Sequence, residues 1–89
     1  MAKLKIAASA QFRRDAKKHL AALITSEWAE IIYCLTNDLS LAKKYHDHQL
    51  TGNLQDFREC HIRPDLLLIY RINKGELLLY RIGSHSEVF

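Results

Sequence analysis

Residues 56–89 read DFRECHIRPDLLLIYRINKGELLLYRIGSHSEVF. Three short runs of this segment are rich in branched and aromatic residues. They are separated by Pro64-Asp65 and by the polar break at residues 73–76. Runs of this kind, bounded by turn residues, are typical of β-strands. The segment therefore predicts a meander of three antiparallel strands.

The pairing of these strands follows if both connections contain an even number of residues. Arg63 then pairs with Leu66 across the first connection, and Ile72 pairs with Leu77 across the second. One row of residues crosses all three strands on the same face: His61, Leu68 and Arg81. Two strand spacings put His61 about 10 Å from Arg81. This predicts a gap in which a phosphate could lie.

The two faces of the predicted sheet differ in polarity. The face of this row also carries Phe57, Glu59, Tyr70 and Leu79. The other face is more apolar and is expected to pack against helices; it carries Cys60, Ile62, Leu67, Ile69, Leu78, Tyr80 and Ile82. Two helices cover only one face, so the first face is expected to stay partly uncovered, as binding surfaces often do.

The first half of the chain predicts a strand and two helices. Residues 4–8 look like a short edge strand that ends at Ser9, a typical helix cap. Apolar residues then recur at helical spacing, and Thr25 or Ser26 caps a second helix that ends at residues 37–38. The short link predicts a helical hairpin. Residues 41–53 are expected to form an ordered loop. The predicted fold class is α+β, with the hairpin packed on one face of a small, mostly antiparallel, twisted sheet.

Length and composition favour a single domain over residues 1–89. A hydrophobic content of 48% with 26% charged residues argues against disorder. No apolar run approaches the length of a membrane span, and the N-terminus lacks the apolar region of a signal peptide. We therefore expect a cytoplasmic protein without membrane contact. Cys34 and Cys60 fit a reducing compartment as small core residues.

The net charge of +3 is unevenly distributed along the chain. The densest basic group contains only Asp15 as an acidic residue: Lys3, Lys5, Arg13, Arg14, Lys17 and Lys18. Such a group is either a phosphate-facing patch or a solvated helix face, and charge alone favours neither. His19 lies among these charges and is expected to be exposed to solvent.

A metal site is the weaker interpretation of the histidines. His46 and His48 could bind a metal together with Cys60 or His61. Their spacing matches no common zinc pattern, however, and Cys60 and His61 are predicted on opposite faces of the sheet. The sequence therefore predicts no metal and no cofactor.

Three motifs carry a resemblance to a known family. They are Asp47-His48-x-Leu50-x-Gly52, the run from Arg58 to Tyr70, and Arg81-x-Gly83-Ser84-His85-Ser86-x-x-Phe89. Together they resemble the YafQ branch of the RelE/ParE superfamily, the toxins of bacterial type II toxin–antitoxin modules. The resemblance implies a compact microbial-ribonuclease-like fold and endoribonuclease action on mRNA, typically on the ribosome. It also implies inhibition by a cognate antitoxin, with any operator DNA bound only through that antitoxin.

The resemblance also assigns candidate site residues. The active-site positions of the family fall on His48, His61, Asp65, Arg81, His85 and Phe89. Many relatives have Trp after the Pro-Asp pair, where this chain has Leu66, so a base-stacking role does not transfer to that position. Because RNA supplies its own nucleophile, the ribose 2′-hydroxyl, cleavage needs an acid, a base and a cation rather than a metal.

These needs suggest a role for each candidate. We expect His85 to be the general acid, with His61 or His48 as the base. Asp65 would orient a histidine, Arg81 would stabilise the charge on phosphorus, and Phe89 would stack on a base. The basic group at residues 3–18 would hold rRNA phosphates while the sheet face holds the message.

Two other classes of function fit the same sequence. A toxin of the same fold could block a protein target such as DNA gyrase, as the ParE branch does. A non-catalytic RNA-binding module could use the basic first helix. The combination of His48, His61 and His85 favours the nuclease.

Overall fold

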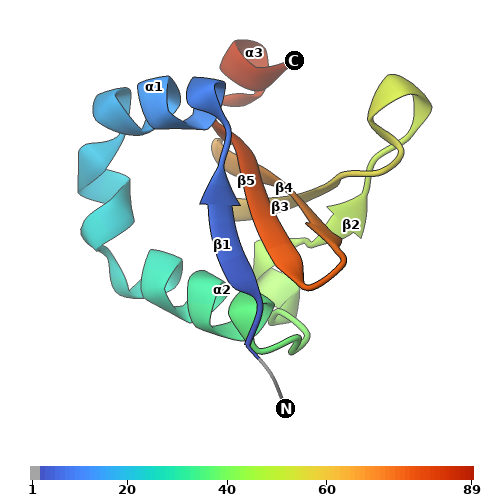
Figure 1. Ribbon diagram of the computed structural model, residues 1–89. Helices are drawn as coiled ribbons and strands as arrows, with labels where there is room; N and C mark the ends of the chain where they lie inside the picture. The colour runs from blue at the N-terminus through green and yellow to red at the C-terminus, as the bar shows by residue number, and fades with distance from the viewer. Residues whose placement is uncertain (1–2) are drawn as a thin grey trace.

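The computed structural model describes residues 3–89 (Figure 1). In chain order its elements are β1 (Lys5–Ala8), α1 (Ala10–Lys18), the 3-10 turn η1 (Leu20–Ile24), α2 (Ser26–Thr36), η2 (Lys43–Tyr45), β2 (His48–Gln49), η3 (Gly52–Leu54), β3 (Arg58–Arg63), β4 (Leu66–Asn73), β5 (Glu76–Gly83) and α3 (His85–Val88). The sheet has the order β1-β5-β4-β3-β2, and only β1 and β5 run parallel. The predicted α+β fold is confirmed.

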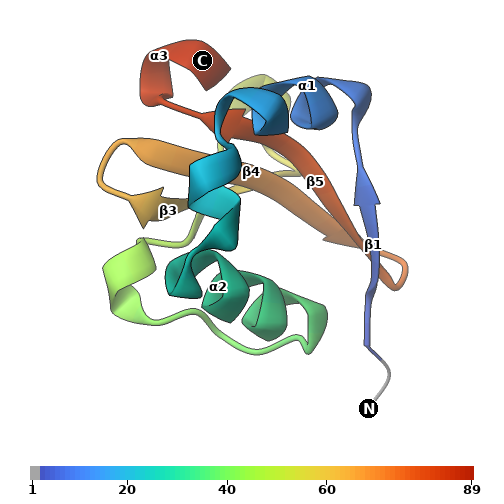
Figure 2. The same cartoon turned by 90° about the vertical axis from the view of Figure 1, so that its left-hand side faces the viewer.

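Both long helices lie on one side of the sheet (Figure 2). Ser9 caps α1 by accepting a hydrogen bond from the N–H of Phe12, and Thr25 caps α2 by accepting one from the N–H of Trp28. The link between them is longer than predicted, because η1 occupies five residues. The helices therefore lie toward opposite ends of the same face, and the stacked rings of Phe12 and Trp28, 6.3 Å apart, fill the space between them.

The strand register matches the prediction at the turns and departs from it further along. Arg63 pairs with Leu66, and Ile72 pairs with Leu77, as predicted. Each ladder, however, contains one extra residue. In β3 the pairing shifts between His61 and Arg63, and in β5 Tyr80 has no partner between Leu79 and Arg81. These are β-bulges, in which two residues of one strand oppose one residue of the other.

Because of the two bulges, each side chain in the paired part of β4 points to the face opposite the predicted one. His61 lies opposite Leu67 and Arg81 lies opposite Ile69, so neither lies opposite Leu68 as predicted. A slip of one residue turns every side chain of a strand to the other face. The core beneath the helices contains Cys60, Ile62, Leu68, Tyr70, Leu79 and Ile82. Leu67, Ile69 and Tyr80 belong to a second cluster. Leu78 lies between Leu77 and Leu79, which both belong to the core beneath the helices, and therefore points to the other face. The predicted faces of Leu67, Leu68, Ile69, Tyr70, Leu78, Leu79 and Tyr80 were therefore wrong.

The face away from α1 and α2 is covered, contrary to expectation. Val88 of α3 packs against Leu67 and Ile69, and Leu50, Phe57 and Tyr80 pack around them. Leu67 is 2% exposed and Ile69 is fully buried. Polar side chains on this face therefore border a small second core. Over residues 3–89, no helix combines the length and hydropathy that crossing a membrane requires.

Candidate functional site

Glu59 joins two of the candidate histidines on the face of the second core. His48 on β2 lies directly opposite Glu59 on β3, and His61 follows two residues later on the same face. The Oε1 atom of Glu59 lies 3.1 Å from Nε2 of His61 and 3.7 Å from Nε2 of His48. Glu59 is only 6% exposed. A buried carboxylate thus forms a hydrogen bond with His61 and lies close to the ring of His48.

The hydrogen bonds assign a role to each ring nitrogen. A carbonyl oxygen can only accept, so Nδ1 of His48, 2.8 Å from the carbonyl of His46, carries a proton. Nε2 is then the nitrogen of His48 that faces Glu59. In His61, Nε2–H donates to Glu59, which leaves Nδ1 of the neutral ring as the acceptor.

A second polar network anchors the segment that carries His48. Asp47 accepts a hydrogen bond of 2.6 Å from the hydroxyl of Tyr70 and two from the guanidinium of Arg58. Burial of the Tyr70 hydroxyl, followed by its hydrogen bond to Asp47, raises the pKa of this tyrosine. The hydroxyl stays neutral and remains a donor. We infer that this network fixes the backbone on both sides of Asp47.

Arg81 extends from the same face and is held by α1. Its Nε and Nη2 atoms donate to Asp15 at 2.8 and 3.3 Å, and Nη2 also donates to the carbonyl of Glu87 at 3.1 Å. The hydrogen bond to Asp15 raises the pKa of Arg81. A guanidinium has five N–H donors, and these three bonds use three of them. Arg81 is thus oriented, partly neutralised, and still able to bind a ligand.

The last two candidates are His85, which begins helix α3, and Phe89, which caps its C-terminal end. Ser84 and Glu87 form a capping box, in which each side chain bonds the backbone of the other. The backbone N–H of His85 donates to Asp65 in the β3–β4 turn at 3.3 Å. The rings of His85 and Phe89 lie 5.0 Å apart. Asp65 therefore contacts the backbone that positions His85.

His19 also supports α3, which corrects the expectation that it is simply solvent-exposed. Its side chain is 24% exposed, and its Nε2 atom lies 3.1 Å from Oε1 of Glu87. Hydrogen bonds from the backbone of Ser84, and then from its side chain and from His19, lower the pKa of Glu87. Asp15 and His19 thus connect α1 to Arg81 and α3.

The candidates share a face but not the predicted row. The row across the sheet runs His48, Glu59, Ile69 and Arg81. His61 lies one step further along β3, opposite Leu67, which separates its backbone from that of Arg81 by about 12 Å in an ideal sheet. Sequence reasoning placed Glu59 on the face of His61 and did not single it out. The alternation of Glu59 and His61 was the available signal.

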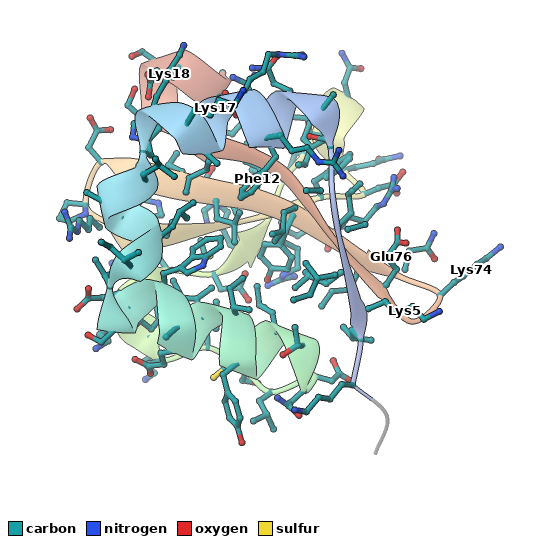
Figure 3. The ribbon with its side chains drawn as sticks, turned by 60° about the vertical axis from the view of Figure 1, so that its left-hand side comes forward. Lys5, Phe12, Lys17, Lys18, Lys74 and Glu76 are labelled. Carbon is teal, nitrogen blue, oxygen red and sulfur yellow. The ribbon has the colours of Figure 1, made fainter. Side chains whose placement is uncertain are left out.

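The basic group is divided in space. All six of its side chains are exposed. Figure 3 shows Lys17 and Lys18 on α1 with Phe12 pointing inward, while Lys5 lies on β1 beside Glu76 at the start of β5 and near Lys74 of the β4–β5 turn. Four cations, Arg13, Arg14, Lys17 and Lys18, thus lie on the helix that holds Arg81. Lys3 and Lys5 belong to a different region.

Of the residues suggested for a metal, His46, His48 and His61 line one cavity, and Cys60 does not join them. Cys60 lies in the core beneath the helices, where burial raises the pKa of its thiol, and His61 points to the opposite face. Cys34 is a free cysteine on α2. Within residues 3–89, no three side chains of His, Cys, Asp or Glu are arranged to hold a metal ion.

The architecture defines the class of protein first: it is that of small bacterial toxins. A copper-bound mutant toxin from Helicobacter pylori is 40% identical to this chain and superposes with a TM-score of 0.89, covering 97% of this chain and 99% of its own. The toxin in the Escherichia coli DinJ–YafQ toxin–antitoxin complex is 29% identical, with a TM-score of 0.83 and 98% of each chain covered.

Sequence comparison then gives the family. The family model described as "Bacterial toxin of type II toxin-antitoxin system, YafQ" matches residues 4–89. The mRNA interferase toxin YafQ of Escherichia coli K12 is 33% identical over 85 residues, which covers 91% of this chain and 90% of that protein. The chain belongs to the YafQ family of type II toxins, as the three motifs indicated.

Proposed function

We propose that this toxin is an endoribonuclease that cleaves mRNA by attack of a ribose 2′-hydroxyl on the adjacent phosphate. Its E. coli relative is an mRNA interferase. The observation that carries the proposal is the shared sheet face: His48, Glu59, His61 and Arg81 lie on it, and α3 brings His85 to its border. This face offers acid–base groups and a cation without a protein nucleophile.

The base is His61 or His48. Either imidazole can take the proton of the 2′-hydroxyl, because histidine changes its charge near neutral pH. Glu59 is the positioning residue: its carboxylate orients both rings and stabilises the cation that forms when one is protonated. The oxygen then bonds to phosphorus as the bond to the 5′-oxygen breaks.

The acid and the cation come from the other side of the site. Arg81 donates its remaining N–H groups to the phosphate oxygens, where negative charge accumulates in the transition state. His85 protonates the departing 5′-oxygen. The products are a 2′,3′-cyclic phosphate and a 5′-hydroxyl end. Asp65 positions His85 through its backbone, and Phe89 stacks on a base beside it.

Because the family consists of toxins of type II toxin–antitoxin systems, an antitoxin partner is expected for this toxin. The E. coli YafQ toxin forms a complex with the antitoxin DinJ, and we propose that a cognate antitoxin binds and inhibits this toxin. Operator DNA is reached only through that antitoxin. The cations of α1, with Lys3 and Lys5, hold rRNA phosphates when the toxin acts on the ribosome. The mRNA substrate places this activity in the cytoplasm.

Mapping of transcript 5′ ends tests the proposal. After brief induction, the wild-type toxin should generate new 5′-hydroxyl ends within messages. His85→Ala should reduce these ends by about 10²- to 10⁴-fold, the usual contribution of one acid–base group. Arg81→Ala should have an effect of similar size.

The variants must be shown to fold, because Arg81 bridges α1 and α3. Circular dichroism and thermal melting serve for this, and Lys74→Gln, in the exposed β4–β5 turn, is the matched control with full cleavage. Growth arrest without new ends would favour a blocked protein target. RNA binding with steep salt dependence and no cleavage would favour a simple RNA-binding module.

A further inference from the structure

A cavity of about 700 Å³ opens beside the candidate histidines. It lies between the first turn of α2, η2 and the outer end of β3. His48 and His61 line one wall, and the other lining residues are Glu27, Lys44, Tyr45, His46, Ile62, Arg63 and Pro64. Arg81 and His85 are not part of the lining. The cavity therefore extends the site away from α3.

The wall of this cavity combines a fixed apolar surface with charges at its rim. Tyr45 is 1% exposed and donates a hydrogen bond of 2.6 Å to Glu30. Ile62 is 3% exposed, and the ring of His46 meets that of His61 edge-on at 5.5 Å. Lys44 and Arg63 are exposed cations. A lining that combines aromatic rings and aliphatic side chains with exposed cations matches a base and its phosphates.

We propose that this cavity binds the nucleotide on the 5′ side of the scissile phosphate, the one that supplies the attacking 2′-hydroxyl. The inference rests on the proposed function. The proton of that hydroxyl passes to His61 or His48, and both line the cavity. The leaving strand is protonated by His85 on α3, which lies outside the cavity lining. The base of the upstream nucleotide therefore lies in this cavity.

This placement of the upstream nucleotide assigns a role to several residues of the cavity lining. Arg63 and Lys44 bind the phosphates of the upstream nucleotide. His46 and Pro64 contact the base. Glu27 is the one carboxylate of the lining, and a carboxylate accepts hydrogen bonds from the N–H groups of a base edge. Glu27 therefore influences which base precedes the cut. A cavity of this volume is within the usual range for a small-molecule site, about 300–1,000 Å³.

Titration with nucleoside 3′,5′-bisphosphates tests the site directly, because these carry both phosphates of the upstream nucleotide. The NMR signals of His46, His61 and Lys44 should shift. The Kd for these nucleotides should rise about three- to tenfold in Arg63→Gln and Lys44→Gln, as expected when a solvent-exposed side chain loses one hydrogen bond. Lys43→Gln, next to Lys44 but outside the lining, should bind as the wild type does.

The same variants are then mapped for their cleavage sites. Glu27→Gln should change the base found 5′ of the cuts, while Lys43→Gln should leave it unchanged. If the wild type cleaves mRNA while Lys44→Gln, Arg63→Gln and Glu27→Gln keep its Kd values and its cleavage sites, the cavity assignment is wrong and the nuclease stands. If nucleotides bind in the cavity and the wild type cleaves nothing, the proposed function fails.

Discussion

Replacing Asp15 with Asn tests how α1 holds the site. Asp15 is 4% exposed and receives hydrogen bonds from Arg81, from the backbone N–H of Ile82 and from Gln11. Asparagine has nearly the same shape but no charge, and only one of its terminal atoms accepts hydrogen bonds. The substitution therefore leaves the guanidinium of Arg81 without its counter-ion while the packing stays almost unchanged.

The expected loss of stability follows from these contacts. Removing one partner of a buried ion pair costs ~3–5 kcal/mol. The side chain of Arg81 is 24% exposed, so water can replace part of what is lost. We therefore expect about 3 kcal/mol, the lower end of that range. In a domain of this size ~1 kcal/mol corresponds to ~4–8 °C, which gives a fall in Tm of about 15 °C.

The pH dependence gives a second measurement. Burial raises the pKa of Asp15, but hydrogen bonds from Arg81, Gln11 and the backbone of Ile82 outweigh it, so the pKa is lowered from 3.8. A group whose pKa is lowered on folding stabilises the protein above its unfolded pKa, and this contribution is lost as the pH falls through the folded value. The difference in Tm between wild type and Asp15→Asn should be full near neutrality and shrink below about pH 4.

Thermal melting followed by circular dichroism provides the assay. Asp56→Asn, an exposed position, is the control and should change stability by less than about 0.5 kcal/mol. A Tm for Asp15→Asn within two or three degrees of wild type would refute the reasoning. So would a difference that stays constant down to acid pH, because the charge of Asp15 would then not be its source.

Three further substitutions probe the rest of the site. Glu59→Gln should reduce cleavage about tenfold or more while Tm changes by a few degrees, since it removes only the charge facing the two histidines; transcript mapping and melting measure the two effects. Gly83→Ala should lower stability by about 1–3 kcal/mol and reduce cleavage, because a Cβ there would lie 2.9 Å from Oε1 of Glu87 and displace α3. Tyr70→Phe should cost ~1–2 kcal/mol in denaturant unfolding, since Asp47 loses a buried hydrogen bond.

Local signals in the sequence were sufficient for β1, the two long helices and the three strands of the meander, whereas β2, within the expected loop at residues 41–53, and α3 were not predicted. Ser9 and Thr25 cap helices because their hydroxyls accept from the N–H groups of Phe12 and Trp28, a contact three residues away. Pairing next to the tight turns was also predictable, because turn length fixes it. The 3-10 turn η1 was missed, since its apolar residues continue the helical spacing of α1.

The faces of the sheet could not be derived in the same way. Residues 66–70 of β4 are all apolar and all buried, so no alternation of polarity marks which side faces the helices. Because every residue of this run is apolar, its sequence does not indicate that a neighbouring strand contains an extra residue. His61 and Arg81 were nevertheless predicted on one face, because both ladders shift by one residue and the errors match.

The side-chain contacts that join distant elements could not be predicted from the sequence. The contacts of Asp15 with Arg81 and of His19 with Glu87 join residues 66 and 68 positions apart. Nothing in their local pattern indicates the partner. The active-site candidates came from motifs, whereas the residues that hold them in place came only from the structure.

The unpaired Tyr80 determines the face of the sheet on which Arg81 lies. If Tyr80 instead paired regularly with Ile69, Arg81 would lie opposite Leu68, beneath the helices. A guanidinium forced into an aliphatic interior would oppose folding itself. The bulge at Tyr80 therefore keeps the guanidinium of Arg81 on the face of His48 and His61 and out of the core beneath the helices.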